Sequence, residues 1–263
     1  MSQSVSGPTI PTTPAQYLDL EACVIGNARV SDDELLKLAT RSDLTIREVR
    51  APLSLVTVAT LHLFLKTHGH NLESFNLQNN RMSGEDFVSL ATMMPELKTL
   101  SFQYLHTVNN EDLLKIIQTC KNLESLIISR NGRISKQAYY QILELDRHFS
   151  VLSLDINGPA PKEVHNEEVT VRAQVENLRL AGLPFGNNDV INVTAIKGLK
   201  TVEFVHTSVQ PEAIAKLYTP DSLPSILITS FSEKKANTFK GFFRDQNIPF
   251  EAQGKKIKTS QKR

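Results

Sequence analysis

The sequence predicts an α/β solenoid, a curved right-handed horseshoe with a parallel sheet on its concave side and helices on its convex side. The first observation is an apolar template, L-x-x-L-x-L, that occurs nine times with successive copies 26, 26, 25, 26, 26, 26, 24 and 24 positions apart. The second is the alternation of apolar and polar residues inside each copy, and the third is a helix-start signal after most copies. A repeat of this period indicates units that bury their apolar faces against one another.

Each copy of the template predicts a short strand. Residues 72–77, LESFNL, alternate in the way that is typical of a strand with one buried face. Because one repeat holds one strand and one helix, successive strands should run parallel and about 4.8 Å apart. A helix is wider than this spacing, so we expect the stack to bend toward its strands. The copies begin at Leu20, Ile46, Leu72, Leu97, Leu123, Phe149, Val175, Leu199 and Leu223.

Polar residues after the strands predict where the helices begin. Serine and asparagine side chains accept hydrogen bonds from the free N–H groups of a first helical turn, and proline fits there because it has no N–H to satisfy. Each of these residues precedes apolar residues that are spaced three or four positions apart. The helix starts expected on this basis lie at Ser31, Ser83, Asn109 or Asn110, Asn188 and Pro211.

Two segments depart from the pattern. Residues 157–174 contain a glycine and two prolines before a β-branched run, so we expect no clean helix there. Residues 232–246 predict a helix, but the template copy due near Ile248 has polar residues where apolar ones belong. We therefore expect a C-terminal cap, from about residue 232, that covers the edge of the sheet.

The domain organisation follows from these patterns. We expect a disordered tail over residues 1–15, one solenoid over residues 16–253 and a basic disordered tail over residues 254–263. That last segment carries five positive charges and no acid, so a nuclear localisation signal, an anion contact or a solubilising terminus could explain it.

Composition narrows the classes of partner. The chain has 263 residues with 40% hydrophobic and 22% charged residues, and no apolar run approaches the roughly 20 residues that span a bilayer. Without the last ten residues, the net charge of +1 becomes −4, which argues against a dedicated nucleic-acid-binding face. The two cysteines, Cys23 and Cys120, are expected to be packed and reduced. We expect a cytoplasmic or nuclear protein without a membrane partner.

The template with a following asparagine, L-x-x-L-x-L-x-x-N, resembles leucine-rich repeats, and three copies complete it with Asn80, Asn131 and Asn157. In that family the asparagine hydrogen-bonds the backbone of the turn after the strand. Segments such as NNEDLLKIIQTCKNLESLIIS resemble the cysteine-containing subclass, which is common in F-box proteins of cullin-type ubiquitin ligases. No F-box pattern precedes the repeats in this sequence, so the resemblance implies no direct attachment to a ligase.

The strand residues between the buried apolar positions should face the concave side, because successive side chains of a strand alternate. They form a polar and mostly uncharged surface with one apolar residue, Ile127, at its centre. Such a surface suits a protein partner better than an enclosed small-molecule substrate. The candidate partner-binding residues are Asn76, Gln78, Ser101, Gln103, Tyr104, Ile127, Ser129, Asp155 and Arg179. Ile127, Tyr104 and Arg179 are the strongest of these, since apolar, aromatic and arginine side chains are the usual interface anchors.

No catalytic constellation is recognised, and no cofactor is expected. His68 and His70 could offer two metal ligands, but no third ligand has a suitable spacing, and a solvated loop before a strand is the favoured interpretation. We thus predict a non-catalytic protein-interaction module that binds a protein partner through the concave face. The alternative is a substrate-recognition or adaptor component of a cullin-type ubiquitin ligase pathway.

Overall fold

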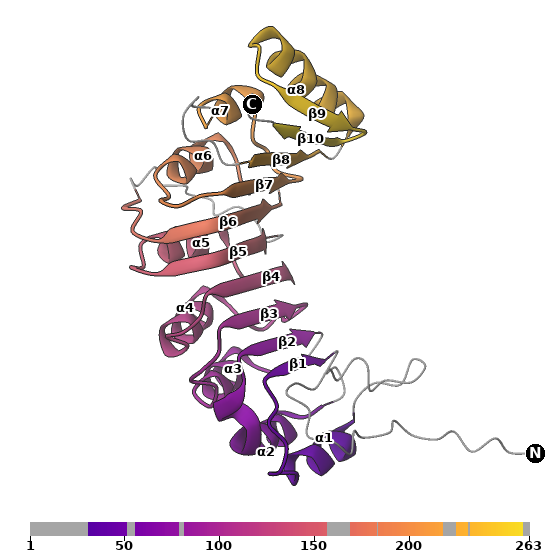
Figure 1. Cartoon of the computed structure of the whole chain (residues 1–263), viewed down its shortest axis with the longest axis vertical. Coiled ribbons are helices and arrows are strands. Elements are labelled where there is room, and N and C mark those ends of the chain that lie inside the picture. Colours follow the sequence, from indigo (N-terminus) through magenta and orange to yellow (C-terminus); the bar gives the residue numbers. More distant parts are fainter. Residues whose placement is uncertain are drawn as a thin grey trace, which may run out of the picture. The chain divides into compact units, whose positions relative to one another are not determined.

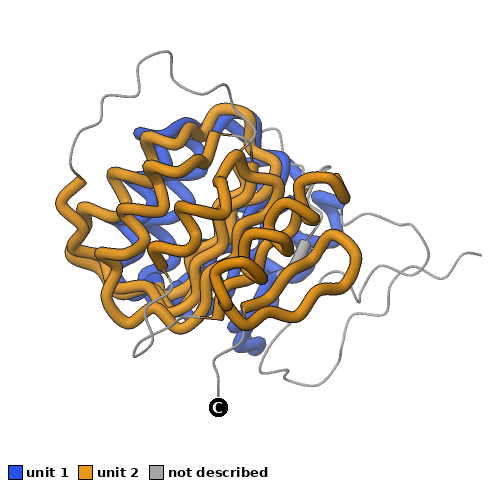
Figure 2. Tube along the Cα trace, turned by 90° about the horizontal axis from the view of Figure 1, so that it is seen from above, with its two compact units in different colours: residues 1–123 blue, residues 124–263 orange. Residues whose placement is uncertain are grey.

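The computed structural model describes residues 31–51, 56–78, 82–156, 169–182, 184–217, 225–230 and 232–259. The chain forms two compact units, residues 1–123 (unit 1) and residues 124–263 (unit 2), which Figure 2 shows in blue and orange. The sequence predicted one continuous domain over residues 16–253. That extent stays a prediction, and each unit is described by itself.

Unit 1 contains three described strands that pair in parallel in the order β1-β2-β3. Helices α2, α3 and α4 lie on one side of these strands (Figure 1). The strands are β1 (Glu48–Ala51), β2 (Ser74–Gln78) and β3 (Thr99–Gln103). The helices are α1 (Asp32–Ala39), α2 (Val58–His68), the 3₁₀ turn η1 (Gly69–Asn71), α3 (Gly84–Ala91) and α4 (Asn110–Thr119).

Unit 2 contains seven described strands in the order β4-β5-β6-β7-β8-β10-β9. Strands β4 to β8 are parallel, whereas β10 runs antiparallel to both β8 and β9. The strands are β4 (Ser125–Asn131), β5 (His148–Ile156), β6 (Gln174–Ala181), β7 (Thr201–Val205), β8 (Ser225–Thr229), β9 (Phe250–Gln253) and β10 (Lys256–Thr259). The helices are α5 (Lys136–Leu143), α6 (Asn187–Thr194), α7 (Pro211–Ala215) and α8 (Glu233–Asp245).

The register of the strands follows the sequence template and confirms the predicted α/β repeat in each unit. In unit 1 the buried Phe75 lies opposite Val49 on one side and Leu100 on the other. In unit 2 one continuous rung runs through Leu126, Leu152, Leu178, Val202 and Ile226. All of these side chains are at most 1% exposed, so hydrophobic burial between neighbouring repeats holds the strands together.

Helix capping also follows the sequence. Ser31, Ser83 and Asn109 each cap a helix, and each forms a capping box with an acidic residue three positions later. Pro211 opens α7 as predicted. The expected helix start at Asn188 is wrong, because α6 begins earlier, with Gly186 as its N-cap. The N–H of Gly186 donates to the side chain of Asp189.

The C-terminal segment corrects the prediction of a basic disordered tail. Residues 254–259 form a tight turn and strand β10, which together with β9 makes a hairpin after α8. Ile257 is fully buried opposite Ile228 of β8, and this apolar contact fixes the hairpin to the sheet. The hairpin covers the edge of β8, in the region where the sequence analysis expects a cap. Residues 1–30 and 260–263 lie outside the described part of the chain, as do Asn80, Asn157 and Cys23.

The chain leaves several strands through a left-handed residue. Tyr104, Arg130 and His206 have φ values of 57°, 53° and 53°, and Gly182 has a φ of 112°. All four occupy the seventh position after the first apolar residue of their template copy. A left-handed conformation costs a residue with a side chain about 1 kcal/mol or more, so its recurrence marks a turn that the repeat geometry imposes.

Asn131 satisfies the turn that follows β4. Its side chain is fully buried, and its Oδ1 accepts hydrogen bonds from the N–H groups of Arg133, at 2.9 Å, and Ile134, at 3.3 Å. Buried backbone N–H groups need such partners. This is the role that the resemblance to leucine-rich repeats implies for an asparagine at this position.

Candidate protein-interaction surface

The sheet face opposite the buried rungs of unit 1 carries five of the nine predicted binding residues. Asn76 of β2 lies directly opposite Ser101 of β3, and Gln78 lies opposite Gln103. All four side chains are half-buried. Tyr104 follows β3 in the left-handed conformation, and its ring meets that of His106 edge-on with a centroid distance of 6.3 Å.

Asn76 has an unused hydrogen-bonding group in this surface. Its Oδ1 is buried and accepts no hydrogen bond from a described residue. A buried polar atom without a partner costs about 1 to 3 kcal/mol. Because this oxygen is closed off from solvent, it gives Asn76 no advantage over the other predicted residues as a contact for a ligand.

The corresponding face of unit 2 carries a row that crosses five parallel strands. Ile127, Ser153, Arg179, Glu203 and Leu227 lie opposite one another in that order, from β4 to β8. Ser153 is buried, at 7% exposure, while the other four side chains are half-buried. The row places Ile127 and Arg179 on the same face, two strands apart, as the sequence predicts.

Arg179 is not a free anchor. Its Nε lies 3.2 Å from Oε2 of Glu203 on the neighbouring strand, and the two side chains are 34% and 32% exposed. Position 203 belongs to the same alternating pattern as Arg179, yet the sequence analysis did not select it as a binding residue. The pair presents both a donor and an acceptor to a partner, rather than a lone positive charge.

Ser129 and Asp155 do not face each other across β4 and β5. The register advances from Ile128 opposite Leu154 to Asn131 opposite Ile156, so β4 has an extra residue between these pairs. Arg130, with its positive φ, lies in this bulge. Asp155 instead pairs with Ala181 of β6. Both predicted residues are half-buried, but the bulge prevents Ser129 from pairing with Asp155 on the neighbouring strand.

The hairpin extends the same face of unit 2 with residues that the sequence analysis assigned to a tail. Lys258 lies opposite Leu227, and Lys256 lies opposite Thr229. Both lysine side chains are exposed, while Ile257 between them is buried. Polar and apolar residues alternate over residues 256–259, directly after a two-residue turn that contains Gly254. This pattern is the signal that could have identified the hairpin.

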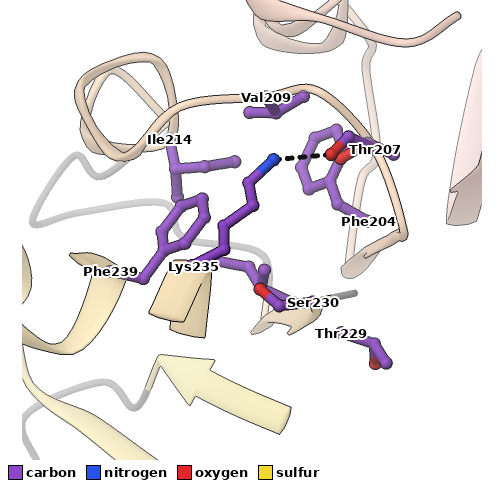
Figure 3. Close-up of a pocket in the computed structure, with 9 residues that line it drawn as sticks. Phe204, Thr207, Val209, Ile214, Thr229, Ser230, Lys235 and Phe239 are labelled. Atoms are coloured by element: carbon purple, nitrogen blue, oxygen red, sulfur yellow. Dashed lines mark hydrogen bonds between the residues drawn. The ribbon is translucent and has the colours of Figure 1, made fainter. Parts of the chain in front are cut away.

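A small cavity lies on the other side of the unit 2 sheet, between β7, β8 and α8 (Figure 3). It measures about 10 Å³, room for about one water molecule, so it cannot hold a metabolite. Lys235 reaches into it and donates to the carbonyl oxygen of Thr207 at 2.7 Å, and burial lowers the pKa of this amine. The hydroxyl of Ser230 is buried there and has no hydrogen-bond partner in the described part of the chain. The lining is mostly apolar core, including Phe204 and Phe239.

The histidines of residues 68–70 do not form the solvated loop that was favoured for them. His68 is the last residue of α2 and is 1% exposed; its Nε2 lies 3.0 Å from the carbonyl oxygen of Leu38, and its ring packs against Phe64. His70 is exposed next to Asn71. Within the described ranges, no group of three or more His, Cys, Asp or Glu side chains could hold a metal ion. Across the same ranges, every helix is too short or too polar to cross a membrane.

Comparison with known proteins finds solved structures that are similar to this chain, one of which is described here. No family model matches the chain, and no curated protein matches its sequence. The chain is similar to one described as the crystal structure of the Rad7 and Elc1 complex in yeast, with 15% sequence identity and a TM-score of 0.46. The likeness covers 84% of this chain and 65% of the matched chain, so this chain spans just under two thirds of the length of the matched chain. The strand register above therefore establishes the α/β repeat independently of this comparison.

Proposed function

We propose that this chain is a non-catalytic protein-interaction module of the leucine-rich-repeat type, and that it binds a protein partner through the exposed face of its parallel strands. The observation that carries the proposal is the register of unit 2. It aligns the half-buried side chains of Ile127, Arg179, Glu203 and Leu227 in one row across neighbouring strands.

The chemistry of this row supports a protein ligand. Two aliphatic side chains flank an arginine–glutamate pair, and the polar groups can be hydrogen-bonded by a partner without burying an unpaired charge. The residues lie on an open sheet face, whereas the cavity of Figure 3 is on the opposite side and is too small for a metabolite. A broad surface with aliphatic anchors and a polar surround is the usual anatomy of a protein–protein interface.

The Asn131 turn supports the leucine-rich-repeat assignment. Its buried amide oxygen accepts two backbone N–H groups immediately after the strand, at the position where the repeat template requires asparagine. The role in a ubiquitin ligase pathway stays a prediction from the resemblance, because no contact within the described residues favours it over other protein partners.

The test compares proteins captured from native cells by the full chain and by two variants, Ile127→Glu on the sheet face and Ile191→Glu on α6. Ile191 is a suitable control because it is an isoleucine exposed by 55% on a helix. We expect specific partners, identified by mass spectrometry, to be lost with Ile127→Glu and kept with Ile191→Glu, with unchanged circular dichroism for both. Equal capture by all three proteins would exclude this face as the interface.

A further inference from the structure

The C-terminal hairpin adds positive charge to the exposed sheet face at one end of unit 2. Residues 232–259 contain seven Lys and Arg and three Asp and Glu, a net charge of +4, whereas the whole chain has a net charge of +1. The rest of the chain therefore has a net charge of −3. The cap is the basic part of an otherwise acidic protein, and its strands are continuous with the proposed interaction face.

Two of these cations are held at fixed positions beside aliphatic side chains. Lys258 lies opposite Leu227 and Lys256 lies opposite Thr229 on β8, while Val205 of β7 lies opposite Thr229 on its other side. We call Val205, Leu227, Thr229, Lys256 and Lys258 the cap face. Its three inner residues are half-buried and its two lysines are exposed. The buried Ile257 fixes the strand that carries the lysines.

The charge of the lysines is not cancelled by ion pairing inside the described chain. Neither Lys256 nor Lys258 forms a salt bridge with a described residue. Glu203, which lies opposite Leu227 on β7, is already paired with Arg179. Glu251 of β9 lies opposite Lys258 in the register without forming an ion pair with it. Two ammonium groups next to a small aliphatic patch complement carboxylates that flank aliphatic side chains.

We infer that the cap face binds an acidic segment of a protein partner. Aliphatic side chains of the partner would pack against Val205 and Leu227, and its carboxylates would pair with Lys256 and Lys258. This inference rests on the proposed function and names the chemistry of the partner. A nucleic acid fits the same surface less well, because phosphate binding needs several unopposed cations. Arg179 is neutralised by Glu203, so the cap face offers only the two cations Lys256 and Lys258.

The test uses the full chain and two fluorescent peptides of equal length, one in which Glu and Leu alternate with Ser and one in which Lys replaces Glu. Binding is measured by fluorescence anisotropy at low and at physiological salt. We expect the Glu peptide to bind and the Lys peptide not to bind. The double variant Lys256→Glu with Lys258→Glu should weaken binding of the Glu peptide by about tenfold, and salt should weaken it in the unmodified chain.

A matched double variant controls for net charge. Lys234→Glu with Arg244→Glu makes the same change in charge on exposed positions of α8 and should leave binding unchanged. An equal loss with both double variants would overturn the inference, because only overall charge would then matter. Tighter binding of a duplex DNA probe that depends on Lys256 and Lys258 would also overturn it, in favour of a nucleic acid.

The variant Val205→Glu separates this inference from the proposed function. If Val205→Glu abolishes binding of the Glu peptide while reversal of the two lysines does not, the sheet face binds a partner but the acidic chemistry is wrong. If the Glu peptide binds all variants as it binds the unmodified chain, the cap face plays no part and the proposed function loses its support in this region.

Discussion

The hydroxyl of Tyr140 on α5 donates a hydrogen bond to Oδ1 of Asp189 on α6 at 2.6 Å, although 49 residues separate the two. Neighbouring repeats are 24 to 26 residues apart, so this contact spans two repeats. The repeat between them has no helix among its described residues, and residues 157–168, which make up most of the segment expected to lack a helix, lie outside the described chain. Helix α5 thus contacts α6 directly, and Lys136 joins the contact with its Nζ 3.4 Å from Oδ2 of Asp189.

The stability of the protein should depend on the hydroxyl of Tyr140 but not on that of Tyr139, the adjacent tyrosine of α5. Tyr140→Phe removes a hydrogen bond to a buried carboxylate and should lower the free energy of unfolding by about 2 kcal/mol. Tyr139→Phe removes a buried hydroxyl that has no hydrogen-bond partner among the described residues, and it should be neutral or stabilising. Urea denaturation measures both. Equal destabilisation by the two variants would contradict the hydrogen bond.

The buried ion pair predicts a non-additive double variant. Lys136 and Asp189 have side-chain exposures of 6% and 0%, so Asp189→Leu leaves an uncompensated buried ammonium group and should cost about 3 to 5 kcal/mol. Adding Lys136→Met should recover part of that loss, because the double variant buries no charge. A double-mutant cycle from denaturation curves gives the coupling. Simple additivity would show that the two groups do not interact.

The hairpin should contribute to the stability of unit 2. Ile257→Ala removes a fully buried side chain between β10 and β8 and should lower the free energy of unfolding by about 2 to 5 kcal/mol. Its exposed neighbour provides the control, since Lys256→Ala should change stability by no more than about 0.5 kcal/mol. If Ile257→Ala also had no effect, residues 254–259 would behave as the disordered tail that the sequence suggested.

Two glycines of unit 2 should differ in the sign of their alanine variants. Gly182 has a φ of 112°, and a Cβ there would collide with the carbonyl oxygen of Ile156, so Gly182→Ala should destabilise by about 2 kcal/mol or more. Gly241 lies inside α8 with open space around it, so Gly241→Ala should stabilise by about 1 kcal/mol. Thermal denaturation distinguishes the two. A stabilising Gly182→Ala would exclude the strained turn.

A surface ion-pair ladder predicts an acid-dependent effect in unit 1. Glu73 lies 2.8 Å from Lys98 and 3.3 Å from Arg47, and the hydrogen bond from Lys98 holds the pKa of Glu73 below its usual 4.5. The resulting stabilisation is present above pH 4.5 and disappears as the pH falls through the lowered pKa. Glu73→Gln should therefore be less stable than the unmodified chain at neutral pH, with the difference vanishing in acid and shrinking at high salt. A difference that persists at low pH would contradict this.

The periodic residues predicted the strands and most helix starts because apolar alternation and capping are local properties of the chain. The register of Phe75 with Leu100 and the capping role of Ser83 both follow from that local pattern. The sequence did not reveal the pairing of Arg179 with Glu203, the buried position of His68 or the placement of Lys256 on a strand. The burial of His68 depends on which segments meet in space, and the spacing of residues in the template does not encode that. The other two features could have been inferred, because Arg179 and Glu203 hold the same position in successive template copies and residues 256–259 alternate after a two-residue turn.

The positions of the candidate binding residues were partly predictable for the same reason. Alternation assigned Asn76, Ile127 and Arg179 to one face of a strand, and the register places them there. The bulge at Arg130 could not be expected from the template, because β4 keeps the apolar spacing of its neighbours and differs only in its backbone conformation. For this reason Ser129 does not lie opposite Asp155, although the two hold the same position in successive template copies.

The reversed direction of β10 limits how an array like this one can lengthen by duplication. A copied repeat brings a strand that pairs in parallel with its neighbours, whereas β10 runs antiparallel to β8. A new parallel strand can still enter between two parallel strands, or between β8 and β10, where it would present to β10 the same edge that β8 presents now. Insertions that preserve the fold should therefore accumulate before the closing hairpin rather than beyond it.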